Sequence, residues 1–219
     1  YRYSRPHNLL VEESDERTTT RYVYLPNSNL LAAKYLCEGE SIRMRHFYAY
    51  DKNGAVKQQI IDNGSNEDQN DLTAVSERHL TRIVNRMQAP IGLPKIVRRY
   101  LVTKEGQETL LYALHNRYND RGQLLEQKYG DEQEKLLYTL LWEYDSNGNV
   151  IKETDALGQT TERIYNELGQ LIQEKQGELI QEFAYDSSGR LVQEQQMGLT
   201  QKFQYDERGQ KVVQQDIYG

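Results

Sequence analysis

Apolar and polar residues alternate with a period of two along several stretches of this chain, and each stretch ends at a tyrosine. Phe183 and Tyr185 are two residues apart, as are Phe203 and Tyr205. Alternation of this kind, rich in aromatic and β-branched residues, is typical of a β-strand. A short polar segment follows each tyrosine, and then comes an apolar pair such as Leu171-Ile172. The pattern therefore predicts strands joined by tight turns.

The turn recurs at nearly constant spacing. It reads Tyr, then Asp or Asn, then two variable residues and Gly, and its tyrosines stand at positions 144, 165, 185 and 205. A second glycine in each interval, as at Gly158, Gly177 and Gly198, marks another turn. Two strands of ordinary length and two turns fill about 20 residues. A fixed period of this size is the signature of a repeat architecture. The sequence thus predicts an all-β fold, a continuous antiparallel ribbon of hairpins with repeats of about 20 residues.

Each repeated residue has a structural role. Asp or Asn after the tyrosine can accept a hydrogen bond from its own backbone two residues on, which starts a turn. Glycine supplies the left-handed conformation that closes the loop. Tyrosine combines a large apolar ring with a hydroxyl that can reach a partner. The residues predicted to carry the repeat are Tyr50, Gly54, Tyr118, Gly122, Tyr144, Asp145, Gly148, Tyr165, Gly169, Tyr185, Asp186, Gly189, Tyr205, Asp206 and Gly209.

The regularity of the repeat divides the chain into three predicted parts of one continuous architecture. Residues 1–61 hold degenerate copies, 62–111 form an irregular connecting segment, and 112–219 hold regular copies. Within the connecting segment, 62–71 is a polar loop by composition. The interval 70–87 is open to two interpretations. Apolar residues at helical spacing favour a short amphipathic helix, whereas Leu80 to Val84 can equally be read as extended.

Composition narrows the classes of function. Only 37% of the residues are hydrophobic and 27% are charged, which suits a thin sheet with much solvated surface. The net charge of −6 argues against a nucleic-acid-binding protein, whose footprint is a basic stripe. No apolar run is long enough for a membrane span. Cys37 is the single cysteine, so it has no partner for an intrachain disulfide. The chain begins at a tyrosine with no capping segment at either end, so we expect a fragment of a longer protein.

Candidate chemistry is sparse. The four histidines, at positions 7, 46, 79 and 115, have no metal-ligand spacing. Asp145 to Asn149 resembles a calcium loop, but its glycine is fourth and not sixth, as an EF-hand requires. Glu153, Glu174 and Glu194 occupy equivalent positions and are expected to be solvated or interleaved with cations. The sequence thus predicts no catalytic residue, no metal site and no cofactor.

These motifs resemble the YD repeats of the RHS family. The resemblance rests on Tyr-Asp-x-x-Gly-x-Leu units, on Gly189-Arg-Leu-Val after Tyr185-Asp-Ser-Ser, and on Thr154-Asp-Ala-Leu-Gly158. It is strong over 112–219 and weaker over 1–60. The resemblance implies a β-ribbon that spirals into a hollow shell, which in many bacterial members encloses a variable C-terminal toxin. Ala156 stands where this repeat commonly has proline, and the autoproteolytic motif of some members is not visible.

Two functions are consistent with this resemblance. The first is a non-catalytic structural segment of a shell around a C-terminal toxin or effector, with the other repeats of the parent chain and the enclosed domain as partners. The alternative is a cell-surface adhesion or carbohydrate-binding module that uses exposed aromatic rings as platforms. An enzyme is a third class, and it is disfavoured because the repeated residues already have structural roles. By resemblance, the protein is expected to be secreted or on the surface of a bacterium.

Overall fold

A computed structural model describes residues 1–4 and 8–218 of the chain. The described residues form eighteen β-strands and no helix. No helix in this part of the chain therefore has the length and apolar character needed to cross a bilayer. The all-β prediction is confirmed.

Two compact units divide the chain. The N-terminal unit comprises residues 1–123 and 128–137, and the C-terminal unit comprises 124–127 and 138–219. The strands of the N-terminal unit are β1 (Arg2–Tyr3), β2 (Leu10–Ser14), β3 (Thr18–Tyr24), β4 (Leu31–Glu38), β5 (Ser41–Tyr50), β6 (Val56–Asp62), β7 (Arg78–Asn85), β8 (Pro94–Val102) and β9 (Glu108–Tyr118). Residues of β10 (Leu124–Gly130) and β11 (Leu136–Tyr144) belong to both units. The C-terminal unit continues with β12 (Val150–Thr154), β13 (Thr160–Tyr165), β14 (Leu171–Gln176), β15 (Leu179–Tyr185), β16 (Leu191–Gln196), β17 (Leu199–Tyr205) and β18 (Lys211–Tyr218).

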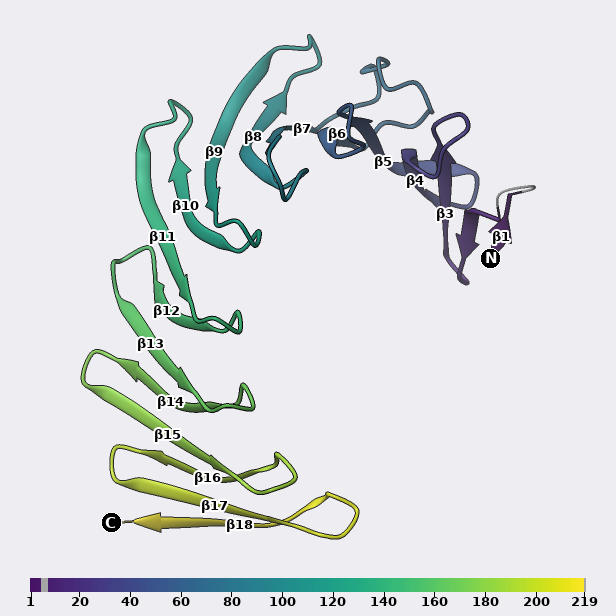
Figure 1. Ribbon diagram of the computed structural model, residues 1–219. Helices are drawn as coiled ribbons and strands as arrows, with labels where there is room; N and C mark the ends of the chain where they lie inside the picture. Colours follow the sequence, from purple (N-terminus) through teal and green to yellow (C-terminus); the bar gives the residue numbers. More distant parts are fainter. Residues whose placement is uncertain (5–7, 219) are drawn as a thin grey trace. The chain divides into compact units, whose positions relative to one another are not determined.

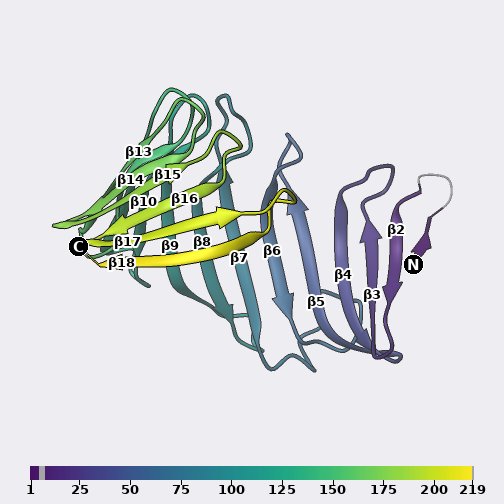
Figure 2. The same ribbon diagram turned by 90° about the horizontal axis from the view of Figure 1, so that it is seen from below.

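Within each unit, every strand pairs antiparallel with its neighbour in the sequence. In the N-terminal unit the pairings run from β1–β2 to β8–β9 (Figures 1 and 2). In the C-terminal unit they run from β11–β12 to β17–β18. Most connections are short turns, and the longest is the segment 63–77 between β6 and β7. The predicted ribbon of consecutive hairpins is therefore what forms.

A β-bulge accompanies the tyrosine-containing turn. Ile164 is paired with Gln173, and Tyr165 is paired with Leu171, so Ile172 between them has no partner. A hairpin loop closed by a residue in the left-handed region commonly carries such a bulge. The same two-for-one pairing leaves one residue unpaired in other repeats, at Ala32, Lys57, Lys95, Ile151, Val192 and Val212. In each case the bulged residue is the second residue of the strand that follows the turn.

The helix considered for 70–87 does not form. Residues 78–85 are strand β7, which pairs with β6 on one side and β8 on the other. Leu80 lies opposite Ile60 and Tyr100 and is buried. Pairing with a strand on each side provides hydrogen-bond partners for the backbone of this segment and buries Leu80, whereas a helix would bury only one stripe. The extended interpretation is the correct one.

Buried apolar residues concentrate in the N-terminal unit. Their main cluster is built on β4 and β5, with Ile60 of β6 packed against it: Ala33, Tyr35, Cys37, Ile42 and Phe47. The rings of Tyr35 and Phe47 meet edge to face, with centroids 6.0 Å apart. In the C-terminal unit, Phe203 is the one buried hydrophobic residue among those the structure describes. A single sheet layer buries little, so stability there depends on contacts between neighbouring strands.

Candidate functional site

The repeated tyrosine joins each repeat to the one before it. The Tyr165 hydroxyl donates a hydrogen bond to the Val150 carbonyl oxygen at 3.1 Å, and Val150 is the first residue of β12. Cross-strand pairing of β12 and β13 ends at Lys152 and Glu162. The tyrosine hydroxyl therefore satisfies a carbonyl that lies beyond the sheet hydrogen bonds, where a buried acceptor would otherwise lack a partner.

This contact is repeated along the chain. In each case the acceptor is the carbonyl of the first residue of the preceding strand, and the distances lie between 2.8 and 3.0 Å. The pairs are Tyr24 with Leu10, Tyr50 with Leu31, Tyr118 with Pro94, Tyr144 with Leu124, Tyr185 with Leu171, and Tyr205 with Leu191. We call this set the tyrosine ladder. All of these tyrosines are partly buried.

An asparagine occupies one position of the ladder. Strand β7 ends at Asn85, whose side-chain amide donates to the carbonyl of Val56, the first residue of β6, at 2.9 Å. The same amide also donates to the Asp51 carboxylate at 3.0 Å. The repeat therefore continues through part of the predicted connecting segment 62–111. Sequence inspection missed it because the position carries no tyrosine and its loop is longer.

The Asp or Asn that follows six of the seven ladder tyrosines organises the turn. One carboxylate oxygen of Asp145 accepts from the backbone N–H groups of Asn147 and Asn149, both at 2.9 Å. The Asn149 side chain donates to the other oxygen, and this hydrogen bond lowers the pKa of Asp145 below its ordinary value. Gly148 closes the loop with φ of 96°. The same pair of backbone hydrogen bonds is accepted by Asp51, Asn119, Asn166, Asp186 and Asp206. Asp131 and Asp155 accept it in turns that do not follow a tyrosine.

The row of glutamates in the C-terminal unit is interleaved with a cation. Arg163 lies opposite Glu174 and contacts it at 2.7 Å, while its other nitrogen contacts Glu153 at 3.0 Å. Further along, the Gln181 side chain donates to Glu194. Alternation with Arg and Gln removes the repulsion that stacked carboxylates would have. The row is thus a set of paired side chains on the tyrosine side of the sheet.

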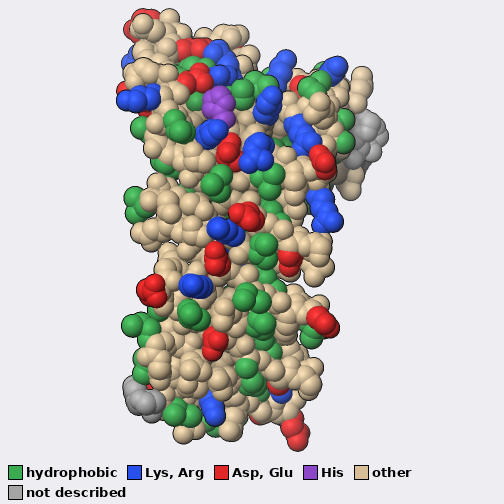
Figure 3. Space-filling view, turned by 60° about the vertical axis from the view of Figure 1, so that its left-hand side comes forward, with side chains coloured by type: hydrophobic (Ala, Val, Ile, Leu, Met, Phe, Trp, Pro, Cys, Tyr) green, Lys and Arg blue, Asp and Glu red, His purple; other side chains and the backbone are tan. Residues whose placement is uncertain are grey.

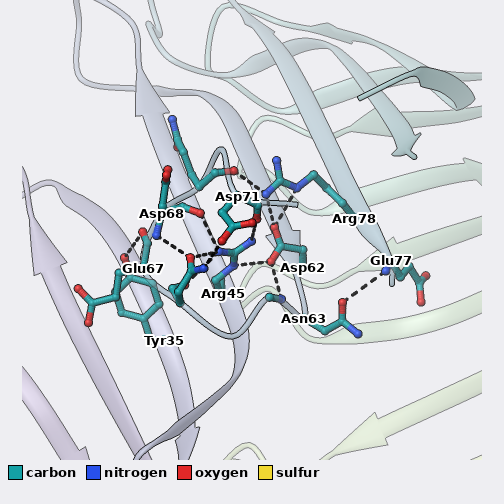
Figure 4. Close-up of polar contacts among 12 residues, drawn as sticks. Tyr35, Arg45, Asp62, Asn63, Glu67, Asp68, Asp71, Glu77 and Arg78 are labelled. Carbon is teal, nitrogen blue, oxygen red and sulfur yellow. Dashed lines mark hydrogen bonds and ion pairs between the residues drawn. The ribbon is translucent and has the colours of Figure 1, made fainter. Parts of the chain in front are cut away.

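The most buried polar residue that the structure describes is an arginine, which no pattern in the sequence singles out. Arg45 of β5 is 0% exposed. Its Nε donates to Asp62 at 2.6 Å, and its terminal nitrogens donate to the backbone carbonyls of Asn66, Asp68 and Asp71 at 2.8–3.1 Å (Figure 4). The guanidinium therefore lies where the polar loop 63–77 folds around it. A loop predicted only from its composition is held mainly by Arg45, and Arg78 of β7 adds a hydrogen bond to the Gln69 carbonyl.

The carboxylate of Asp62 is shared between two cations. Arg78 of β7 contacts the oxygen that Arg45 leaves free, at 2.7 Å, and the backbone N–H of Gly64 donates to the first oxygen at 2.9 Å. Burial by itself raises the pKa of Asp62, and the hydrogen bonds from Arg45, Gly64 and Arg78 outweigh it, so the pKa lies below its ordinary value. A Cβ at Gly64 would collide with the buried guanidinium of Arg45, so only glycine fits there. We call Arg45, Asp62 and Arg78 the buried ionic cluster.

The remaining titratable residues form no reactive arrangement. His46 and His79 lie on the same face, two strands apart, and His115 lies on the opposite face beside Glu134. Burial lowers the pKa of His46. His7 lies outside the described residues. Among the residues that the structure describes, no three His, Cys, Asp or Glu side chains are placed to hold a metal ion.

Comparison with known proteins points to one family. The family model described as Teneurin YD-shell matches residues 107–216, which is half of the chain. Those residues carry the regular part of the tyrosine ladder. No curated protein sequence matches this chain.

Several solved structures with similarity to this chain are toxin complexes. The crystal structure of TcdB2-TccC3 has a TM-score of 0.43 and 14% identity, covering 92% of this chain and 14% of that chain. The TcdB2-TccC3-Cdc42 crystal structure has a TM-score of 0.40 and 14% identity, covering 89% of this chain and 15% of that chain. A Tc holotoxin pore from Photorhabdus luminescens has a TM-score of 0.29 and 13% identity, covering 92% and 14%. This chain thus spans about a seventh of the length of these three toxin chains.

Proposed function

Because this chain belongs to the Teneurin YD-shell family, we propose that it forms part of the wall of a β-shell that encloses a C-terminal toxin or effector domain. Its own role is structural, as is common to that family. The partners of the segment are then the other repeats of the parent chain and the enclosed domain. This function needs stable contacts between repeats and no catalytic residues in the wall.

The tyrosine ladder is the observation that carries this proposal. Seven tyrosines, those of the ladder pairs described above, tie the end of one strand to the start of the strand before it. Repeats that contact only their neighbours can extend in one direction without changing the contact. A wall of any length is therefore built by adding one more unit.

The repeated residues are used by folding, which supports a non-catalytic role. The Asp and Asn oxygens of the turns accept backbone hydrogen bonds, and the tyrosine hydroxyls donate to backbone carbonyls. A general base or nucleophile needs a free, activated group within reach of a substrate. The proposal therefore assigns no reaction to this segment.

The alternative, a carbohydrate-binding or adhesion module, receives less support. Such a module needs a contiguous row of exposed aromatic rings. Among the described residues, the exposed large hydrophobics include only two aromatics, Tyr1 and Tyr3. Trp142 and the ladder tyrosines are partly buried. With family membership, this favours a shell segment of a protein that is secreted or on the surface of a bacterium.

Protease protection tests the proposal. The parent protein would carry an epitope tag in the domain after the repeats and would be digested alongside that domain expressed alone. We expect the enclosed domain to survive at protease concentrations that degrade the isolated one. Digestion at equal rates, or a parent reading frame with no domain after the repeats, would refute enclosure. Tyr185→Ala should disrupt one contact of the tyrosine ladder and expose the enclosed domain to the protease. Tyr185→Phe, which keeps the ring, serves as the matched control.

A further inference from the structure

A pocket rich in cations lies at the end of the strands β7, β8 and β9 in the N-terminal unit. Its volume is about 460 Å³. Three of its lining side chains are cationic and none is acidic: Arg86, Lys95 and Arg117. Val84 and Met87 add apolar surface, and both are exposed. The pocket thus combines positive charge with an apolar flank.

Lys95 owes its place to the β-bulge of its repeat. Val84 is paired with Ile96 and Asn85 with Pro94, so Lys95 is the unpaired residue between them. Bulges redirect a side chain out of the regular alternation of a strand. Ala32, Ile151, Ile172, Val192 and Val212 hold the equivalent bulged position in other repeats. Those five residues are apolar, Lys57 is the other lysine at a bulge of this kind, and Lys95 is exposed.

Arg86 is fixed in the wall of the pocket by the neighbouring turn. It donates to the Asn119 carbonyl at 2.9 Å, and its side chain is 17% exposed. The one carboxylate near it, Asp120, is 3.6 Å away and fully exposed. An exposed ion pair of this length contributes little and neutralises the cation only weakly. Arg86 therefore remains available for a second acceptor.

Two arginines next to the pocket are each paired with a carboxylate. Arg82 and Arg98 are cross-strand partners, and each holds a carboxylate through two hydrogen bonds, Arg82 with Glu108 and Arg98 with Glu134. Lys and Arg side chains gather around a histidine in the upper part of Figure 3. Two of the cations on β7 and β8 are thus neutralised within the fold, and no acidic residue lines the pocket to do the same there.

We propose that this pocket binds the carboxylate side chain of an acidic peptide segment. Arg86 and Lys95 supply charge-assisted hydrogen bonds to the carboxylate, and Val84 and Met87 pack against its methylene groups. A large polyanion such as a nucleic acid is disfavoured because the chain has a net charge of −6. A short peptide in the pocket is screened by salt from the distant negative charges of the chain, since the Debye length is about 8 Å at physiological salt. Binding of this kind goes beyond the shell proposal, because it does not require an enclosed domain.

Fluorescence anisotropy with the 219-residue chain tests this site. The probes are two short labelled peptides of the same length, one of alternating Glu and Ala and one with Gln in place of Glu. Lys95→Glu should weaken binding of the Glu peptide about tenfold or more, which corresponds to losing one charge-assisted contact. Lys57→Glu is the matched control, because Lys57 is also a bulged lysine but does not line the pocket. Lys95→Ala is measured as well, and circular dichroism checks that each variant is folded.

The outcomes separate the proposal from its competitors. Binding of the Glu peptide alone, weakened by both Lys95 variants and unaffected by Lys57→Glu, is the expected result. Equal binding of the Gln peptide, or equal weakening by Lys57→Glu, overturns the site. Displacement of the peptide by inorganic phosphate at the concentration of the peptide would identify a general anion site and overturn the choice of a peptide carboxylate.

Discussion

Replacing Arg45 by methionine should destabilise the N-terminal unit severely. The variant keeps the length of the side chain but removes the charge that faces the Asp62 carboxylate at 2.6 Å and three backbone carbonyls of the loop 63–77. Arg45 and Asp62 have side chains that are both 0% exposed. Breaking such a buried pair by removing one partner costs about 3–5 kcal/mol, because a charge is left without compensation.

The three backbone carbonyls that lose their donor in Arg45→Met add little to this loss of stability. Each buried acceptor without a donor costs roughly 1–3 kcal/mol, but the loop can hydrate them by opening. We therefore expect the loop to detach and the total loss to stay near the cost of the broken pair. Arg78 still contacts Asp62, so part of the negative charge remains balanced.

Amide hydrogen exchange measured by mass spectrometry is the appropriate assay. Peptides from β5 to β7 report the opening free energy of the region around the cluster. Trp142 is the single tryptophan and belongs to the C-terminal unit, so its fluorescence follows unfolding there. The matched control is Arg43→Met, because Arg43 lies on the same strand but is mostly exposed and pairs with the exposed Glu38. That control should cost less than about 1 kcal/mol.

Two results would refute this reasoning. The first is a loss for Arg45→Met within about 0.5 kcal/mol of that for Arg43→Met, which would place the cluster in solvent. The second concerns Arg45→Met combined with Asp62→Leu, which removes the uncompensated carboxylate. That double variant should be more stable than Arg45→Met alone, and equal or lower stability would mean that uncompensated charge is not the cause.

Three other predictions follow from the ladder, the turns and the cluster. Tyr185→Phe should cost about 1 kcal/mol by removing one hydrogen bond to Leu171, and Tyr185→Ala should cost several kcal/mol in urea unfolding; a loss below about 0.5 kcal/mol for Tyr185→Ala would mean that the ring packs against nothing. Gly189→Val should cost about 1–3 kcal/mol in thermal unfolding, because φ is 81° there and a Cβ would lie 3.3 Å from the Gln170 amide. Gly189→Asn should cost less, because asparagine tolerates a positive φ better than valine. Equal losses for the two variants would contradict the strain argument. The pKa of Asp62 is lower in the folded than in the unfolded protein, so its contribution to stability is present above the unfolded pKa of about 3.9 and is lost as pH falls through the folded pKa. The stability difference between wild type and Asp62→Asn, measured by hydrogen exchange, should therefore shrink at lower pH. A difference that stays constant with pH would contradict the assignment.

The hydrogen bonds of the turns explain how much of the fold could be predicted from the sequence. The hydrogen bonds of Asp145 reach only to residues two and four positions along the chain, and Gly148 adopts the conformation that glycine favours. All of the information for that turn lies within five consecutive residues. The tyrosine partner was less accessible, because Val150 is brought to Tyr165 only when β12 and β13 pair.

The structure of the connecting segment was harder to predict from the sequence, because it also depends on contacts between distant residues. Helical spacing and alternation were both present between residues 70 and 87, and local pattern gives no preference between them. Pairing with β6 and β8 decides for the strand. Asn85 then takes the ladder position through a contact with Val56, which is 29 residues earlier in the sequence. No feature of the residues around Asn85 marks it as equivalent to a tyrosine.

By itself, the sequence determined the repeat, the all-β class, the turns and the family, because each depends on residues that are close together in the chain. Tertiary structure alone decided the strand at 78–85, the role of Asn85 and the burial of Arg45. Arg45 is bound to residues 17 to 26 positions away, and an arginine on a strand reads as a solvated residue until the loop folds over it. Local hydrogen bonds can be read from spacing, whereas burial of a charge depends on which distant groups replace its water.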